Sequence, residues 1–143
     1  MREFKIGQKA SFSRTITETD LVQYAGISGD YNPIHVDQVY AEGTRFKQRI
    51  AHGLLTSSLL SRLLGMELPG PGAVYLEQTM RFIRPVFTGD TITAIVEIIE
   101  INDEKRTIKL KTECHKHDGK LVLDGVASML VPDEVRSDDN KPA

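Results

Sequence analysis

The stretch SGDYNPIH, residues 28–35, places an acid, an amide and an imidazole, Asp30, Asn32 and His35, within six residues around Pro33. General acid–base catalysis needs groups whose pKa values can be tuned toward neutrality and that reach one small molecule. Histidine is nearest to neutrality by nature, and burial can bring a carboxylate there. A loop can turn both side chains toward one point, whereas a strand would set residues five apart on opposite faces. The alternative is an ordinary Asx turn, in which Asp30 and Asn32 cap the next segment.

The second candidate is AHGLLT, residues 51–56, where Gly53 lies at the expected start of a buried helix. A helix N-terminus presents free N–H groups and the positive end of the helix dipole. It can bind phosphate or hold the oxygen of a polarised carbonyl group. The alternative is a simple helix start, with His52 as a cap or packing residue. Ser57 and Ser58 could line a ligand cavity, or they could be small residues where the helix meets a sheet.

His115 and His117 form a third candidate, because two residues apart on a strand share one face and could bind a metal. No third ligand is evident nearby, so the pattern favours a solvated strand end beside a turn. Cys114, the single cysteine, excludes an internal disulfide and suits a strand residue better than a nucleophile. The sequence lacks a Gly-x-Gly-x-x-Gly motif, a Walker loop and a Cys-x-x-Cys pair. We therefore expect neither a nucleotide cofactor nor a metal.

These candidates must be positioned by an ordered set of helices and strands. The pattern predicts a strand at 9–17, a short helix after residue 17 that ends near Gly26, a helical turn at 37–42 ended by Gly43, a long apolar helix within 50–66, and strands at 74–83, 91–101, 106–117 and 120–131. The long helix is apolar nearly all round, which is typical of a buried central helix. Segregated helices and strands indicate an α+β fold, with an antiparallel sheet wrapped around that helix.

Composition sets the broad class of protein. The 143 residues fit one domain, expected over 1–132. A polar tail at 133–143 is expected to be disordered, because its composition cannot bury apolar surface. A net charge of −2 argues against a nucleic-acid or membrane-surface binder. The first 16 residues contain no apolar core of signal-peptide length, and no run approaches a bilayer span, so the cytoplasm is the expected compartment.

Two stretches, 29–64 and 69–92, resemble the MaoC-like dehydratase family, and most of all its single-domain (R)-specific enoyl-CoA hydratases. The likeness runs from about Phe4 to Val131. It is specific at three motifs, which occur in the family's order and at its separations: Asp30-x-Asn32-Pro33-x-His35, Ala51-His52-Gly53 and Phe82-x-x-Pro85-Val86-x-x-Gly89-Asp90.

The resemblance implies a hot-dog fold and a homodimer with the active site near the subunit interface. It implies that Asp30 and His35 are the catalytic pair that holds the reacting water, and that Asn32 supports them. It also implies that the backbone N–H of Gly53 polarises a thioester carbonyl, and it places Ser57 near the site. The implied activity is (R)-specific hydration of trans-2-enoyl-CoA to (R)-3-hydroxyacyl-CoA without a cofactor.

Hydration requires water activated at C3, a proton delivered to C2 and a stabilised thioester oxygen. One member of the pair removes a proton from water and the other supplies the C2 proton, and the sequence does not assign these roles. The CoA phosphates favour basic residues at the site mouth. Five are available, with preference for Arg84 because it adjoins the Pro-Val motif: Arg45, Lys47, Arg49, Arg81 and Arg84. Side-chain bulk at Leu63, Leu64 or Leu68 would set the acyl-chain length.

Three other functions stay open at this point. Two are an acyl-carrier-protein dehydratase and an acyl-thioester hydrolase of the same fold. Common hot-dog thioesterases carry a carboxylate on the central helix, whereas no acid lies between Leu54 and Met66 here. The third is a non-catalytic acyl-CoA-binding module, which the complete polar set argues against. The product could serve polyhydroxyalkanoate synthesis, fatty-acid metabolism or a secondary pathway.

Overall fold

The computed structural model describes residues 3–132. Its elements are β1 (Lys9–Thr15), α1 (Glu18–Ser28), α2 (Pro33–Val36), α3 (Gln38–Glu42), α4 (Gly53–Met66), β2 (Val74–Gln78), β3 (Arg81–Phe82), β4 (Thr91–Asn102), β5 (Thr107–Lys116) and β6 (Leu121–Leu130). The tail predicted at 133–143 lies outside the described residues. Among the helices of residues 3–132, none is long and apolar enough to cross a bilayer.

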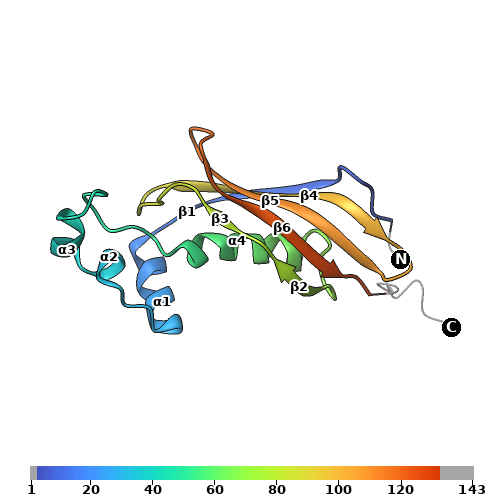
Figure 1. Ribbon diagram of the computed structural model, residues 1–143, viewed down its shortest axis with the longest axis horizontal. Coiled ribbons are helices and arrows are strands. Elements are labelled where there is room, and N and C mark those ends of the chain that lie inside the picture. Colours follow the sequence, from blue (N-terminus) through green and yellow to red (C-terminus); the bar gives the residue numbers. More distant parts are fainter. Residues whose placement is uncertain (1–2, 133–143) are drawn as a thin grey trace.

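An antiparallel sheet extends along one long helix, α4, and the two enclose the hydrophobic core (Figure 1). The strand order is β1-β4-β5-β6-β2, and β3 also pairs with β6. Alternate residues of β4 and β5 are buried, because successive strand residues point to opposite faces of a sheet. The buried set includes Ile92, Ala94, Val96, Ile98, Ile108, Leu110 and Cys114. This is the α+β hot-dog arrangement that the sequence predicts.

Helix α4 is buried on one side rather than all round. Its core face carries Leu55, Leu59, Leu60, Leu63 and Leu64. Leu54 and Met66 are exposed, so the prediction of an apolar helix buried on all sides is wrong for their face. The reason is that the sheet of a single chain covers only one side of the helix (Figure 1).

Helices α1, α2 and α3 gather at the end of the molecule where α4 begins (Figure 1). Helix α1 starts with a capping box, in which the Thr17 hydroxyl accepts from the N–H of Asp20 and the Asp20 carboxylate accepts from the N–H of Thr17. It runs past Gly26 and ends at Gly29, whose φ of 77° is left-handed and easiest for glycine. Asp30 follows at once, so the end of α1 sets the start of the polar stretch.

The strand predicted at 74–83 is interrupted between Gln78 and Arg81, and both halves pair with β6. Here Thr79 passes very close to Gly125, since a Cβ at position 125 would stand 2.6 Å from the Thr79 carbonyl carbon. The Thr79 N–H donates to the Val126 carbonyl, and the Thr79 hydroxyl accepts from the Val126 N–H. The alternating sequence could not reveal this break, because its cause lies on a strand far along the chain.

Candidate active site

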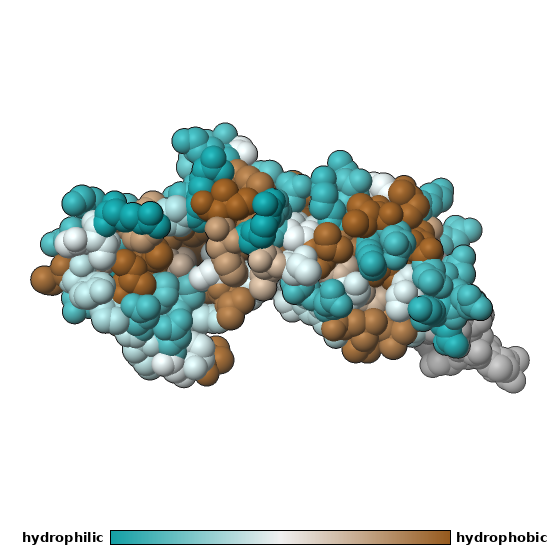
Figure 2. Space-filling model, viewed as in Figure 1, coloured by the Kyte–Doolittle hydropathy of each residue, from teal (hydrophilic) through white to brown (hydrophobic). Residues whose placement is uncertain are grey.

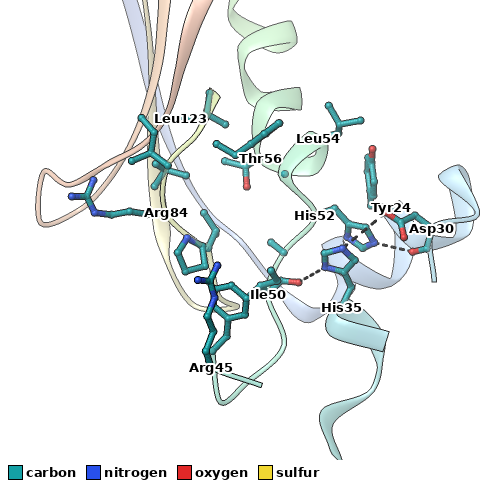
Figure 3. A pocket seen from close by; sticks show the side chains of 18 residues that line it. Tyr24, Asp30, His35, Arg45, Ile50, His52, Leu54, Thr56, Arg84 and Leu123 are labelled. Atoms are coloured by element: carbon teal, nitrogen blue, oxygen red, sulfur yellow. Dashed lines mark hydrogen bonds and ion pairs between the residues drawn. The ribbon is translucent and has the colours of Figure 1, made fainter. Parts of the chain in front are cut away.

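A cavity of about 400 Å³ opens where α4 begins. Its wall is built from α1 and the loop after it, from α2, from the first turn of α4 and from the chain around β3 (Figure 3). Of the candidate site residues selected from the sequence, Asp30, His35, Arg45, Gly53 and Arg84 line it. Segments far apart in the sequence therefore bring both candidate stretches, 28–35 and 51–56, to one point.

The imidazole of His35 is held in one orientation. Its Nδ1 lies 2.7 Å from the carbonyl oxygen of Ile50, which can only accept, so Nδ1 carries the proton. In the neutral ring Nε2 is then an unprotonated acceptor, and it lies 4.0 Å from Oδ2 of Asp30. His35 is buried, whereas the Asp30 side chain is 50% exposed and reaches solvent. The two groups thus present two acceptor atoms to the cavity.

Burial lowers the pKa of His35 below its ordinary value. The nearby imidazole of His52 lowers this pKa further, while the hydrogen bond to Ile50 and the charge of Asp30 act in the opposite direction. The net direction is downward, so His35 is mainly neutral at pH 7. A neutral imidazole with a free Nε2 is suited to accept a proton.

The Asx turn and the catalytic pair are both present. The N–H of Asn32 donates to Oδ1 of Asp30, at 3.2 Å, while the other carboxylate oxygen faces His35. Oδ1 of Asn32 accepts from the N–H of Ile34 and caps α2, the short helix that carries His35. Asn32 is therefore a cap in this structure and is not among the described residues that line the cavity.

Gly53 begins α4, and among the described residues its N–H has no acceptor. The ring of Phe82 covers this glycine, because a Cβ at position 53 would stand 2.7 Å from Cε1 of Phe82. Only a residue without a side chain fits under that ring unless the ring moves. The free N–H at the positive end of the helix dipole suits a developing negative charge on oxygen. Ser57 points elsewhere, since its hydroxyl donates to the carbonyl of Leu54 and it lines a different hollow.

The structure separates the five basic candidates. Arg45 and Arg84 line the cavity and lie across it from the histidines (Figure 3). Arg49 forms a two-pronged pair with Glu18, and Arg81 forms one with Asp124. Lys47 is not among the described lining residues. Leu63, Leu64 and Leu68 are buried in the core and do not belong to this lining either.

Sequence reasoning missed two buried polar residues of the cavity wall, His52 and Thr56. His52 is 2% exposed, and its Nε2 lies 3.0 Å from the carbonyl oxygen of Asp30. It occupies the N-cap position of α4, but its side chain makes no capping bond. The hydroxyl of Thr56 also has no partner among the described residues and points toward the cavity (Figure 3). The feature of the sequence that could have identified His52 is its place directly before Gly53. That place was interpreted only as a cap or packing position.

The remaining sequence candidates are not among the described residues that line this cavity. His115 bonds through Nε2 to the carboxylate of Glu113, at 2.7 Å, at the end of β5. Cys114 is a buried strand residue, as predicted, and burial raises the pKa of its thiol to about 12. Within residues 3–132, the His, Cys and acidic side chains close enough to share a metal ion are Asp30, His35 and His52, with ligand atoms within 4.8 Å. The rings of His35 and His52 each keep one nitrogen that has no carbonyl partner. Both proton transfer and metal ligation require such a nitrogen.

Comparison with known proteins finds relatives that match most of the chain. The family model of the MaoC-like domain matches residues 3–119. An (R)-specific enoyl-CoA hydratase from Rhodospirillum rubrum is 45% identical over 130 residues, which are 91% of this chain and 90% of that protein. A mitochondrial 3-hydroxyacyl-(acyl-carrier-protein) dehydratase from Solanum lycopersicum is 36% identical and covers 95% of this chain and 82% of its own length. A solved structure described as the (R)-hydratase from A. caviae involved in PHA biosynthesis superimposes with a TM-score of 0.89 at 38% identity, covering 92% of this chain and all of that one.

Proposed function

Because this chain belongs to the MaoC-like family, we propose that it catalyses the reversible (R)-specific hydration of trans-2-enoyl-CoA to (R)-3-hydroxyacyl-CoA. It is accordingly a lyase. One observation carries this proposal beyond the likeness to relatives. The acceptor atoms of Asp30 and His35 lie 4.0 Å apart in the same cavity as the free N–H of Gly53. These are the parts that hydration of an unsaturated thioester needs.

The spacing of the pair suits one water molecule. Two acceptors 4.0 Å apart can each lie about 2.8 Å from the same water oxygen, and they then receive its two hydrogens. The lone pairs of that water are left to face the substrate. Asp30 and His35 therefore orient the water for attack on C3 of the enoyl group.

The tautomer of His35 indicates which atom takes the reacting proton from the water. We assign both proton steps to His35, in place of the two separate groups expected from the sequence. Nε2 accepts a proton from the water as the water oxygen bonds to C3, and the resulting imidazolium returns that proton to C2 on the same face. Asp30 stabilises the transient positive charge, while the N–H of Gly53 stabilises the negative thioester oxygen. Removing one such oxyanion donor commonly costs about 3 kcal/mol of transition-state stabilisation. Asn32 supports the pair indirectly, by capping the helix that carries His35.

The CoA end of the substrate requires cations. Arg45 and Arg84 line the cavity and have no carboxylate partner among the described residues, whereas Arg49 and Arg81 are neutralised by Glu18 and Asp124. We assign the two cavity arginines to the phosphates. The acyl chain takes the apolar part of the cavity, which includes Leu54, Val122 and Leu123.

We also propose that the working form is a homodimer. Exposed apolar side chains cluster along α4 and β2–β3, among them Leu54, Met66, Val74, Leu76, Phe82 and Ile83. Figure 2 shows several apolar patches, with polar groups between them, on the face of the molecule seen in Figure 1. Strand β2 lies at the edge of the sheet, so a second copy could cover this surface. The cytoplasmic location stays a prediction of the sequence.

The function is tested with purified protein and crotonyl-CoA. We expect the enoyl-thioester absorbance to fall while the thioester stays intact, with an (R)-3-hydroxy product. Release of free CoA with the double bond retained would identify a thioesterase instead.

The plant relative favours a second candidate function, a 3-hydroxyacyl-carrier-protein dehydratase, so crotonyl-acyl-carrier-protein is compared with crotonyl-CoA at equal concentration. A higher kcat/KM for the carrier-protein substrate would assign the chain to that dehydratase class. Tight binding of acyl-CoA without turnover would indicate a binding module.

The pH dependence follows from the lowered pKa of His35. The base is active when neutral, so kcat/KM should fall as the pH drops through this pKa. An ordinary imidazole has a pKa of about 6.5. We therefore expect more than half of the plateau activity at pH 6.5 and an acid limb with its midpoint below that value. A midpoint above 6.5 would contradict the buried neutral His35, and the profile is measured in buffers of constant ionic strength.

A further inference from the structure

We propose that His52 is a positioning residue of the reaction, and that its ring holds the Asp30 loop, the His35 imidazole and the start of α4 in one arrangement. This inference rests on the proposed hydratase function and assigns a role to a residue that the mechanism above does not use. His52 does not donate or accept the reacting proton. It acts through the groups that do.

The first contact fixes the loop that carries Asp30. Nε2 of His52 lies 3.0 Å from the Asp30 carbonyl oxygen, and a carbonyl oxygen can only accept. The proton of the neutral ring therefore sits on Nε2 and is donated to the Asp30 backbone. Figure 3 shows this bond beside the bond from His35 to the carbonyl of Ile50. Each histidine is thus anchored to a different backbone carbonyl.

The second contact fixes the ring of His35. The two imidazoles stack with centroids 3.9 Å apart and an angle of 25° between their planes. On the other side Tyr24 lies 4.7 Å from the ring of His52, tilted by 53° (Figure 3). His52 is 2% exposed and has little freedom to move. A ring packed in this way restricts the rotation of His35 and so directs its Nε2.

The third connection is covalent, because His52 directly precedes Gly53. The carbonyl of His52 accepts the first bonds of α4, from the N–H groups of Leu55 and Thr56 at 3.1 and 3.3 Å. The residue that holds the acid–base pair therefore also begins the helix that offers the N–H of Gly53. A displacement of His52 would shift the water-binding atoms relative to the thioester-binding atom.

Packing alone does not account for a histidine at this position. Its Nδ1 is buried and has no hydrogen-bond partner among the described residues. A buried polar atom without a partner destabilises a fold, and an apolar ring of similar size would avoid that loss. The bond to Asp30 and the stack on His35 offer a reason to keep the imidazole.

The charged and titratable groups around His52 lead to a second measurable effect, which is a change in the pKa of His35. Asp30, His35 and Tyr24 face it, and Arg45 and Arg84 lie across the cavity. When it is protonated, the His52 ring lowers the pKa of His35 by its positive charge. An uncharged residue at position 52 should therefore raise the pKa of His35. The readout that separates positioning from a purely structural role is a loss of kcat at little-changed KM that a hydrogen-bond donor at position 52 partly restores.

The test compares His52→Gln, which can still donate to the Asp30 carbonyl, with His52→Phe, which keeps a ring but cannot donate. We expect His52→Phe to lower kcat roughly 10- to 100-fold, the effect of misplacing catalytic groups by about 1 Å, with KM changed less than about threefold. His52→Gln should recover part of this loss. Both variants should move the acid limb of kcat/KM to higher pH. His115→Gln, at a histidine that does not line the cavity, is the matched control and should leave kcat and the pH profile unchanged.

A measurement without substrate keeps the inference separate from the hydratase function. Nitrogen-15 NMR of wild-type protein should show the proton of neutral His52 on Nε2, and the pKa of His35 should be higher in His52→Gln than in wild type. If wild type does not hydrate crotonyl-CoA, the proposed function is wrong, and these spectra still decide the coupling of the rings. A proton on Nδ1, an unchanged pKa of His35, or wild-type kcat in folded His52→Phe would each overturn the role of His52.

Discussion

Replacing His35 with alanine is expected to lower kcat about 1,000-fold while the protein remains folded, because the variant loses its general base. Nε2 of His35 is the free nitrogen of a neutral, buried ring, and it lies 4.0 Å from Oδ2 of Asp30. Asp30→Asn is expected to lower kcat at least about 100-fold. The amide keeps the shape and one acceptor oxygen but removes the charge that stabilises the imidazolium.

The double variant sharpens this test. If Asp30 and His35 hold one water together, the double variant should be no slower than His35→Ala alone, since groups that act as a unit are not additive. Exposed residues of the same types, Asp103→Asn and His117→Ala, are the controls and should retain wild-type kcat. All variants are assayed with crotonyl-CoA after thermal unfolding confirms the fold. Near-normal turnover in either single variant at the pair would contradict the mechanism.

Replacing Gly125 with alanine is expected to destabilise the protein by more than about 3 kcal/mol, above the usual cost of one extra methyl group in a core. The new Cβ would lie within the van der Waals radius of the Thr79 carbonyl group and 3.1 Å from Cα of Met80. Both neighbours are backbone, so a rotamer change cannot relieve the clash. The chain between β2 and β3 would have to separate from β6.

Gly65→Ala is the matched control for this prediction. Gly65 lies in α4 with no atom within 4 Å of an added Cβ, and its backbone is not left-handed. Alanine there should be neutral or stabilise the helix by up to about 1 kcal/mol. Urea unfolding of both variants measures the two free energies. Equal stability of the two variants would show that the close contact between the Thr79 backbone and position 125 can relax without a loss of stability.

The local sequence is sufficient for the elements and for the acid–base stretch. Alternating residues in 91–101 and 106–117 predict strands with one buried face, and β4 and β5 bury that face. Gly53 was correctly placed at the start of α4, because a glycine ahead of a leucine-rich run is visible in the sequence. Asp30 and His35 were chosen on residue type and on the loop between them, and the structure brings their side chains to one cavity.

Features that depend on distant residues were decided only by the tertiary structure. The choice among the five cations required Glu18 and Asp124, which neutralise Arg49 and Arg81 across 31 and 43 positions of the chain. The break between β2 and β3 required the approach of Gly125, and the contacts of His52 required α1, α2 and α4 to meet. Helix caps, strand alternation and motif spacing are short-range patterns that a sequence displays directly. Which free atoms share one cavity depends on how the sheet and helix bring remote segments together, and that is fixed only when the chain folds.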